Sequence, residues 1–223
     1  MQIQLKQLDL RAGERVSLRN ISWDEFEQIL EELGDERGTR VAYYEGMLEI
    51  IAPMAGHEKS KSIIRSLVEI ILEELDIEFD PLGSTTFNCR RVKAGIEPDE
   101  CFYIQNEAAV RGKKRIDLNI DPPPDLAIEI DVTTDSQTRK SSYQALGIPE
   151  LWIYDGTKLR INVLQEGKYV DSDKSQVFPD LKIVELIPQY VALSQERGRN
   201  VAVKAFRSSN LSLAGFGWRV FAG

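Results

Sequence analysis

The segment that most constrains the fold is LAIEIDV, residues 126–132, because it has the composition of a strand buried inside a sheet. The run is rich in β-branched residues and has the length expected of a strand covered on both faces. It follows DPPPD at residues 121–125, where three consecutive prolines prevent regular hydrogen bonding and require a stiff loop. We therefore predict that residues 126–132 form the central strand of an α/β fold.

Two carboxylates share one face of this predicted strand. Side chains alternate along a strand, so Ala127, Glu129 and Asp131 point to one face, while the isoleucines and the valine among them pack on the other. Buried ionised carboxylates need a cation, an arginine or lysine, or a shifted pKa. An acidic pair of this kind is more often structural, paired with a nearby basic residue, than catalytic.

A third carboxylate stands in PDECFYI, residues 98–104, whose leading proline and aromatic content suit the start of a strand. There Asp99 shares a strand face with Cys101 and Tyr103. If this strand neighbours the central one, three carboxylates converge. Three oxygen ligands suit Mg²⁺ or Mn²⁺, whereas a single histidine, His57, argues against a histidine-based zinc site.

The other segments alternate between helix and strand patterns. The first predicted helix has Ser22 as its N-cap and Glu25 three residues later, which is the pattern of a capping box. The helices are predicted over residues 22–34, 56–75, 136–146 and 188–198. The strands are predicted over 40–53, as a hairpin turning near Glu45-Gly46, over 77–80 and 83–89, and over 151–170 with turns at Asp155-Gly156 and Glu166-Gly167.

The chain length of 223 residues favours one compact domain. We expect this domain to cover residues 1–203, with a core at about 22–190. The segment 204–223 loses hydrophobic periodicity and is expected to be a peripheral tail.

A net charge of −8 argues against a protein that coats nucleic acid through a general basic surface. It leaves a nuclease open, because metal-binding carboxylates add to the negative total. Phosphate contacts could come from the local basic clusters at 90–93 and 111–115, although solvated loop charge explains each cluster equally well.

The sequence contains no apolar run long enough for a membrane span, and its start lacks the apolar centre of a signal peptide. We therefore expect a cytoplasmic protein that does not bind membranes. Cys89 and Cys101 have no metal-type spacing partner, so we expect buried thiols rather than a disulfide.

The order of elements resembles the core of the PD-(D/E)XK nucleases, which runs helix, three strands, helix, strand. The likeness is closer to one subgroup, the Uma-type restriction endonuclease family, which is especially abundant in cyanobacteria. It is carried by YYEGMLEIIAP followed by GHE, then IEPDECFYI, PDLAIEIDVTTDS and YQALGIPELWIYD, which span residues 43–155 in the right order. The resemblance implies a restriction-endonuclease-like fold, with a mixed central β-sheet flanked by helices.

The resemblance also implies a metal-dependent endonuclease that hydrolyses phosphodiester bonds in DNA. It implies Asp99 and Glu129 as ligands of Mg²⁺ or Mn²⁺, with Glu45 or Glu58 as candidates to complete the acidic cluster. His57 stands at the family's histidine position, where it would contact phosphate or orient a ligand. A capping or packing role is the alternative for this histidine.

The sequence departs from the superfamily at one position. Two residues after Glu129, where a lysine is standard, the chain has Asp131. In the family a basic residue four positions before the tyrosine of YxxxGxPE looks like the migrated replacement, and here that residue is Arg139, beside Lys140. A lysine can act as a base after its pKa falls on burial, whereas arginine stays protonated.

Helical spacing separates these two basic residues. Arg139 shares a helix face with Tyr143 and Leu146, the side expected to lie against the sheet, while Lys140 is about 100° away. Three alternatives follow for the missing lysine. Lys140 reaches the site, or Arg139 supplies positive charge to the transition state while metal-bound water attacks without a lysine. In the third alternative neither residue replaces the lysine and the catalytic activity of the site is weakened.

Three functions follow from these alternatives. The leading hypothesis is a DNA endonuclease that uses Asp99 and Glu129, assisted by Glu45 or Asp131. The second is an inactive nuclease-like domain that binds nucleic acid or protein, and the third is a regulatory or structural protein in which Arg139 neutralises the carboxylates. A double-stranded target needs two cuts, so a symmetric dimer is consistent with the leading hypothesis.

Overall fold

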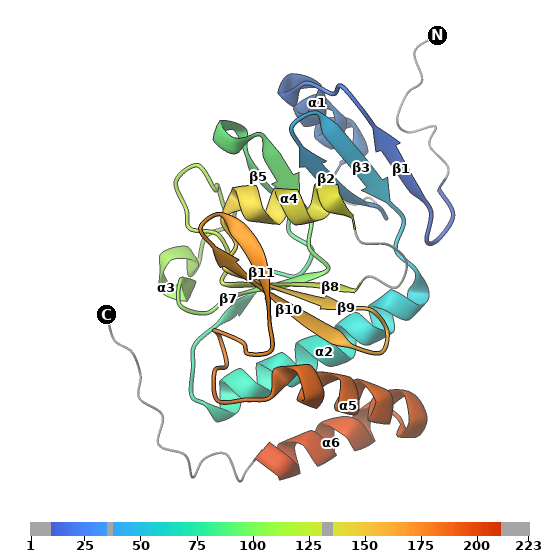
Figure 1. Cartoon of the computed structure of the whole chain (residues 1–223), viewed down its shortest axis with the longest axis vertical. Coiled ribbons are helices and arrows are strands. Elements are labelled where there is room, and N and C mark those ends of the chain that lie inside the picture. The colour runs from blue at the N-terminus through green and yellow to red at the C-terminus, as the bar shows by residue number, and fades with distance from the viewer. Residues whose placement is uncertain (1–9, 35–37, 131–135, 211–223) are drawn as a thin grey trace.

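The computed structural model describes residues 10–34, 38–130 and 136–210. Within these residues the chain forms two β-sheets, with helices packed between them and against their outer faces (Figure 1). The predicted α/β class is confirmed. Asp131, Val132 and the three residues that follow lie outside the described residues, as does the end of the chain after Asn210.

The first sheet is antiparallel throughout. In spatial order its strands are β1 (Arg15–Leu18), β3 (Met47–Ile51), β2 (Arg40–Tyr44), β6 (Ala94–Ile96) and β5 (Phe87–Cys89). Strands β2 and β3 form the predicted hairpin. Helix α1 (Trp23–Leu33) covers the outer face, where Phe26 stacks on Tyr43 at 4.4 Å between ring centroids. The predicted capping box of Ser22 and Glu25 begins this helix.

The second sheet is mixed, as predicted for the restriction-endonuclease-like core. In spatial order its strands are β11 (Lys168–Ser172), β10 (Leu159–Gln165), β9 (Glu150–Tyr154), β8 (Leu126–Ile130), β7 (Glu100–Tyr103) and β4 (Asp80–Pro81). Strands β8 and β9 are parallel, and the other neighbouring pairs are antiparallel. Strand β8 therefore lies inside the sheet, as its apolar composition predicted.

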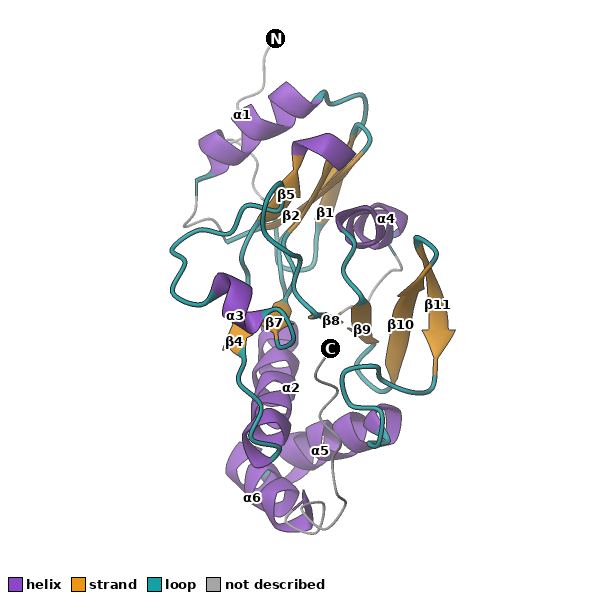
Figure 2. Ribbon diagram, turned by 90° about the vertical axis from the view of Figure 1, so that its left-hand side faces the viewer, coloured by secondary structure: helices purple, strands orange, loops and turns teal. Residues whose placement is uncertain are grey.

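The helices cover both faces of the mixed sheet (Figures 1 and 2). They are α2 (Ala55–Glu74), α3 (Glu107–Val110), α4 (Gln137–Leu146), α5 (Ile183–Arg197) and α6 (Arg199–Asn210). Helix α4 lies between the two sheets, while α2, α5 and α6 pack together on the opposite side. The apolar core therefore has two parts on either side of β8. One lies between the mixed sheet and helices α2, α5 and α6, and the other lies between the mixed sheet and helix α4.

Strand β8 shows the predicted alternation. Ile128 and Ile130 pack in the apolar cluster formed with α2, and Ala127 packs in the cluster formed with Tyr143 of α4. Glu129 therefore points to the α4 side of the sheet. Asp131, the expected second carboxylate of this face, lies outside the described residues.

The C-terminal part differs from the expectation. The closing helix begins at Ile183 rather than 188, and a further helix, α6, runs from Arg199 to Asn210. Phe206, expected in a peripheral tail, is fully buried and contacts the ring of Tyr190 edge-on at 4.8 Å. The expected domain boundary at residue 203 therefore falls within a packed helix. Strand β1 likewise extends the fold beyond the expected start of the core at residue 22.

Two smaller expectations can be compared with the structure. Cys89 and Cys101 are buried free thiols, as predicted. Within the described part of the chain, no helix combines the length and the apolar character needed to cross a bilayer.

Candidate active site

Asp99 and Glu129 lie next to each other on neighbouring strands. The antiparallel register pairs Glu100 with Ile128, so Asp99, just before β7, stands opposite Glu129 of β8. The Asp99 carboxylate is fixed there because its Oδ2 accepts a hydrogen bond from the backbone N–H of Ile130 at 2.8 Å. Both side chains are buried and both line one cavity of about 100 Å³.

Arg139 neutralises Glu129 from helix α4. Its guanidinium donates to Glu129 Oε1 in a buried ion pair and to the backbone carbonyl of Glu97 at 3.1 Å. The hydroxyl of Tyr143, one turn further along α4, donates to the same Oε1. Arg139, Tyr143 and Leu146 are all buried, which confirms the predicted inward face of this helix.

Burial controls the protonation of this cluster. It raises the pKa of Glu129 to about 7, because the positive charge of Arg139 only partly offsets the cost of desolvating the carboxylate. Desolvation has the largest single influence on Arg139 and lowers its pKa, but Glu129, Tyr143 and Asp99 together outweigh it and raise the pKa of Arg139. Burial also raises the pKa of Tyr143 far above its usual value. Tyr143 is therefore a hydrogen-bond donor to Glu129 and not a base.

Lys140 approaches the same cavity from a different side of α4. It is half-buried and lines the cavity together with Arg139, although the two side chains leave the helix in different directions. The start of α4 is held by Ser136, whose hydroxyl accepts from the backbone N–H of Arg139 at 3.2 Å. The same hydroxyl donates to Glu49 Oε2 at 2.6 Å, which ties α4 to strand β3.

Three residues at the site were not singled out from the sequence. Glu49 is a buried carboxylate of β3, and Arg15 of β1 forms an ion pair with it at 3.6 Å. Arg15 and Arg40 of β2 both line the cavity. Glu49 lies within YYEGMLEIIAP, a segment already quoted for the family resemblance, so this motif could have indicated it. No such motif contains Arg15 or Arg40, so only the pairing of strands β1, β2 and β3 could reveal them.

Of the other expected site residues that the structure describes, some line the cavity and others do not. His57, in the first turn of α2, lines the cavity. Glu45 is exposed in the β2–β3 turn, and Glu58 is half-exposed and lies 3.8 Å from Lys61. Neither glutamate lines the cavity. The structure therefore brings together Asp99, Glu129, Arg139, Lys140 and His57, but not Glu45 or Glu58.

The carboxylates provide a donor set that fits a hard divalent cation. Their contacts with other described residues use Oδ2 of Asp99 and Oε1 of Glu129, which leaves one further oxygen on each. The described residues contain no group of three or more acidic, histidine or cysteine side chains arranged to hold a metal. Two carboxylates still suit Mg²⁺, which usually keeps several waters and is completed by substrate phosphate.

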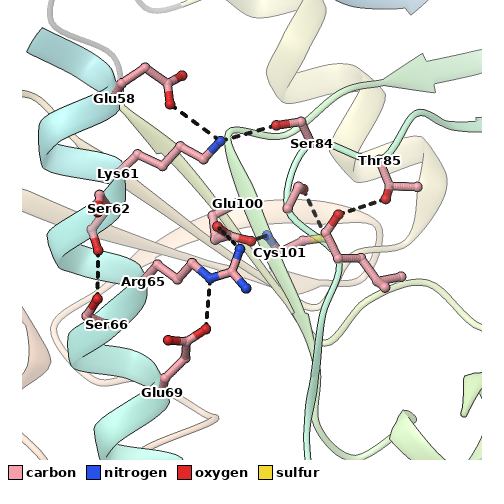
Figure 3. A network of polar contacts seen from close by, with 12 residues as sticks. Glu58, Lys61, Ser62, Arg65, Ser66, Glu69, Ser84, Thr85, Glu100 and Cys101 are labelled. Carbon is pink, nitrogen blue, oxygen red and sulfur yellow. Dashed lines mark hydrogen bonds and ion pairs between the residues drawn. The ribbon is translucent and has the colours of Figure 1, made fainter. Parts of the chain in front are cut away.

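Another buried carboxylate lies on the opposite face of β7 (Figure 3). Glu100 points toward α2, where it accepts from Arg65 Nη1 at 3.3 Å. Arg65 also donates to Glu69 at 2.8 Å, and Lys61 donates to Ser84 at 3.2 Å. Burial raises the pKa of Glu100, and Arg65 opposes the shift. This network lines no part of the cavity and connects α2 to the sheet.

Comparisons with known proteins bear on the fold and on the family of the chain. A solved structure described as a putative nuclease of family DUF820 from Anabaena variabilis superposes with a TM-score of 0.50 at 21% identity, covering 77% of this chain and 99% of that one. No curated protein matches the chain. The family model described as "Putative restriction endonuclease" (Uma2) matches residues 23–195, most of the chain. The protein therefore belongs to the Uma2 family of restriction-endonuclease-like proteins.

Proposed function

We propose that this protein is a divalent-metal-dependent nuclease that hydrolyses phosphodiester bonds in DNA. The observation that carries the proposal is the cavity in which Asp99 and Glu129, from adjacent strands, face Lys140 from α4. Metal-assisted hydrolysis of a phosphodiester can use two carboxylates that hold the ion and a lysine that adds positive charge beside them. Membership of a family described as restriction endonucleases supports the same reading.

Asp99 and Glu129 would hold Mg²⁺ or Mn²⁺ through the oxygens that the contacts among the described residues leave over. When bound, the ion polarises the phosphodiester and lowers the pKa of the attacking water. The protein fixes one ligand in advance, because the Ile130 N–H orients the Asp99 carboxylate. Arg139 and Tyr143 do the same for Glu129.

Lys140 and Arg139 have different roles in this proposal. Lys140 is half-buried at the cavity, so its amine can accept a proton from, or place positive charge beside, the attacking water. Arg139 remains protonated and cannot act as a base. It positions Glu129 and contributes positive charge near the reacting phosphate.

DNA as the substrate is consistent with the local charge of the site. The whole chain carries a net charge of −8, yet the described residues that line the cavity include Arg15, Arg40, Arg139 and Lys140 beside the two carboxylates. A local excess of positive charge attracts phosphate without a general basic surface. Cleavage of both strands by a symmetric dimer stays a prediction.

A second candidate is a nuclease-like domain that binds nucleic acid without cutting it. The specific observation in its favour is the buried ion pair of Arg139 with Glu129, reinforced by Tyr143. These contacts neutralise one of the two metal ligands without any ion. If Arg139 and Tyr143 keep these contacts when metal is present, Oε1 of Glu129 is not available to the metal.

Plasmid nicking separates the two candidates. Supercoiled DNA is incubated with the protein in Mg²⁺, in Mn²⁺ and in EDTA, with a matched RNA substrate alongside. The nuclease proposal expects conversion to nicked or linear DNA with metal, none in EDTA, and loss of cleavage in Glu129→Gln. Retained DNA binding without cleavage under every metal condition would instead support the binding domain.

A further inference from the structure

We propose that Arg15, Arg40 and His57 form an anion-binding wall of the cavity, which holds a backbone phosphate of the strand to be cleaved. This inference deepens the proposed nuclease function and rests on it. The three residues come from β1, β2 and α2, and all line the cavity that also contains Asp99 and Glu129. The name anion-binding wall is used below for these three residues.

The strand register explains why the two arginines act together. Arg15 of β1 and Arg40 of β2 are both paired with Ile51 of β3, one from each side. Residues paired across a sheet present their side chains on the same face, so all three point to the cavity side. With neighbouring strands about 4.8 Å apart, the two arginines flank Ile51 at a separation of roughly 10 Å between backbones. Their long side chains can converge on one anion.

Two buried nitrogens of the wall lack hydrogen-bond partners among the described residues. They are Nε of Arg40 and Nε2 of His57. A buried polar group left without a partner costs free energy, so native proteins usually satisfy such groups with water or a ligand. Both side chains line the cavity, so a small rotation of each could bring its nitrogen to a ligand in that space.

The existing acidic partners of the two arginines differ in how strongly they compete with an anion. Arg40 lies 3.9 Å from Glu58, whose side chain is 52% exposed, and Arg15 lies 3.6 Å from Glu49. The ion pair of Arg40 with exposed Glu58 therefore contributes little stabilisation, whereas Glu49 is buried and competes more strongly with an anion for Arg15. Arginine binds phosphate well because its planar guanidinium donates several hydrogen bonds at once.

The start of helix α2 adds to the positive potential. Its N-cap, Met54, supplies no side-chain hydrogen bond, and the neighbouring Pro53 and His57 line the cavity. The first backbone N–H groups of a helix and its dipole favour an anion at this position. The cavity thus has an acidic side, formed by Asp99 and Glu129, and a cationic side formed by the anion-binding wall and the start of α2.

The size of the cavity limits what can enter. Its volume of about 100 Å³ is several times the roughly 10–15 Å³ that a single water molecule needs. The space suits a phosphate group but not a stacked base pair. We therefore assign to the wall a phosphate of the nucleic-acid backbone, held next to the metal-binding carboxylates.

Phosphate binding without metal tests this assignment. Inorganic phosphate, and then a short DNA oligonucleotide, are titrated into the full chain in EDTA, and binding is followed by calorimetry. Arg15→Gln, Arg40→Gln and His57→Gln are compared with Arg197→Gln, a matched control at the exposed end of α5. Thermal unfolding verifies that each variant is folded. We expect the Arg15 and Arg40 variants to weaken phosphate binding at least about tenfold, and the control to match the wild type.

The outcomes distinguish this inference from the proposed function. Asp99→Asn should abolish cleavage yet bind phosphate at least as well as the wild type, because it removes negative charge from the cavity. Phosphate binding that follows the wall residues, in a protein that never cuts DNA, supports the wall and rejects the nuclease. The anion-binding wall is overturned if the wild type binds no phosphate, or if its phosphate affinity equals that of Arg40→Gln. This holds even if the protein cleaves DNA. Tight inorganic phosphate without oligonucleotide binding overturns the nucleic-acid assignment.

Discussion

Asp99 and Glu100 are consecutive residues whose carboxylates lie in opposite environments. Asp99 faces α4 and lines the cavity with Glu129, whereas Glu100 faces α2 and belongs to the network with Arg65 (Figure 3). The exposed fractions are 7% for Asp99 and Glu129 and 1% for Glu100, so all three are buried. Each side also has an arginine, Arg139 or Arg65.

The difference lies in what surrounds the charges. On the α2 side, Arg65 and the backbone N–H of Cys101 both donate to Glu100, which does not line the cavity. On the α4 side there is a cavity, and two buried nitrogens of its lining, on Arg40 and His57, lack partners among the described residues. A buried carboxylate alone therefore does not indicate chemistry. The proposed site therefore rests on the combination of buried carboxylates, adjacent space and unsatisfied donors.

The largest expected effect separates the two faces directly. Asp99→Asn should lower the rate of DNA cleavage roughly 10³-fold, because a metal ligand contributes several kcal/mol of transition-state stabilisation. The isosteric change Glu100→Gln, one residue away, should leave the cleavage rate close to that of the wild type. Initial rates of plasmid nicking measure both. Equal losses in the two variants would remove the distinction between the faces.

Lys140 should show the next largest effect. Lys140→Gln is expected to lower kcat about 10²-fold, the effect of losing a lysine amine that accepts a proton from the attacking water. Lys140→Arg should not restore the rate, because arginine stays protonated. Lys204→Gln, at an exposed position of α6, is the matched control. A fully active Lys140→Arg variant would show that this residue supplies charge alone.

The pKa of Glu129 predicts a pH dependence of metal binding. Its pKa is raised to about 7, and a carboxylate must lose its proton before it binds a metal. Affinity for Mn²⁺ should therefore rise with pH, by up to about tenfold per unit below 7, and level off above that value. Calorimetric titrations at several pH values measure the slope. A slope of zero, or the same slope in Glu129→Gln, would contradict the assignment.

The smallest effect concerns the α2 face. Arg65→Gln should lower the free energy of unfolding by about 1 kcal/mol, because it removes one donor from buried Glu100 while the 38% exposed arginine is partly screened by water. Cleavage per folded molecule should not change. Denaturant unfolding and nicking rates measure the two quantities, with Arg197→Gln as the control. A loss of cleavage without a loss of stability would assign Arg65 to the site.

The sequence predicted the parts of the site that depend on local pattern. The convergence of Asp99 and Glu129 was predicted only on the condition that their strands are neighbours, which the register shows. Alternation along residues 126–132 and 98–104 assigned each carboxylate to one face of its own strand, and helical spacing separated Arg139 from Lys140. These inferences need only the period of a strand or helix. They were therefore available before any tertiary contact was known.

The rest depended on contacts between distant segments. Arg15 and Arg40 reach the site only because both pair with Ile51, and nothing in their local sequences indicates that register. Phe206 was placed in a peripheral tail because the segment after about Lys204 loses hydrophobic periodicity. Its burial depends on the Tyr190 ring of α5, which the sequence does not reveal as a partner.

Titration of Mn²⁺ into the metal-free protein tests the central claim, that Asp99 and Glu129 hold a divalent ion. Wild type, Asp99→Asn and Glu100→Gln are compared by calorimetry at a pH above 7, where Glu129 is ionised. We predict that the wild type and Glu100→Gln bind Mn²⁺ alike, and that Asp99→Asn loses the binding. Undiminished Mn²⁺ binding by Asp99→Asn, or no binding by the wild type, would contradict the claim.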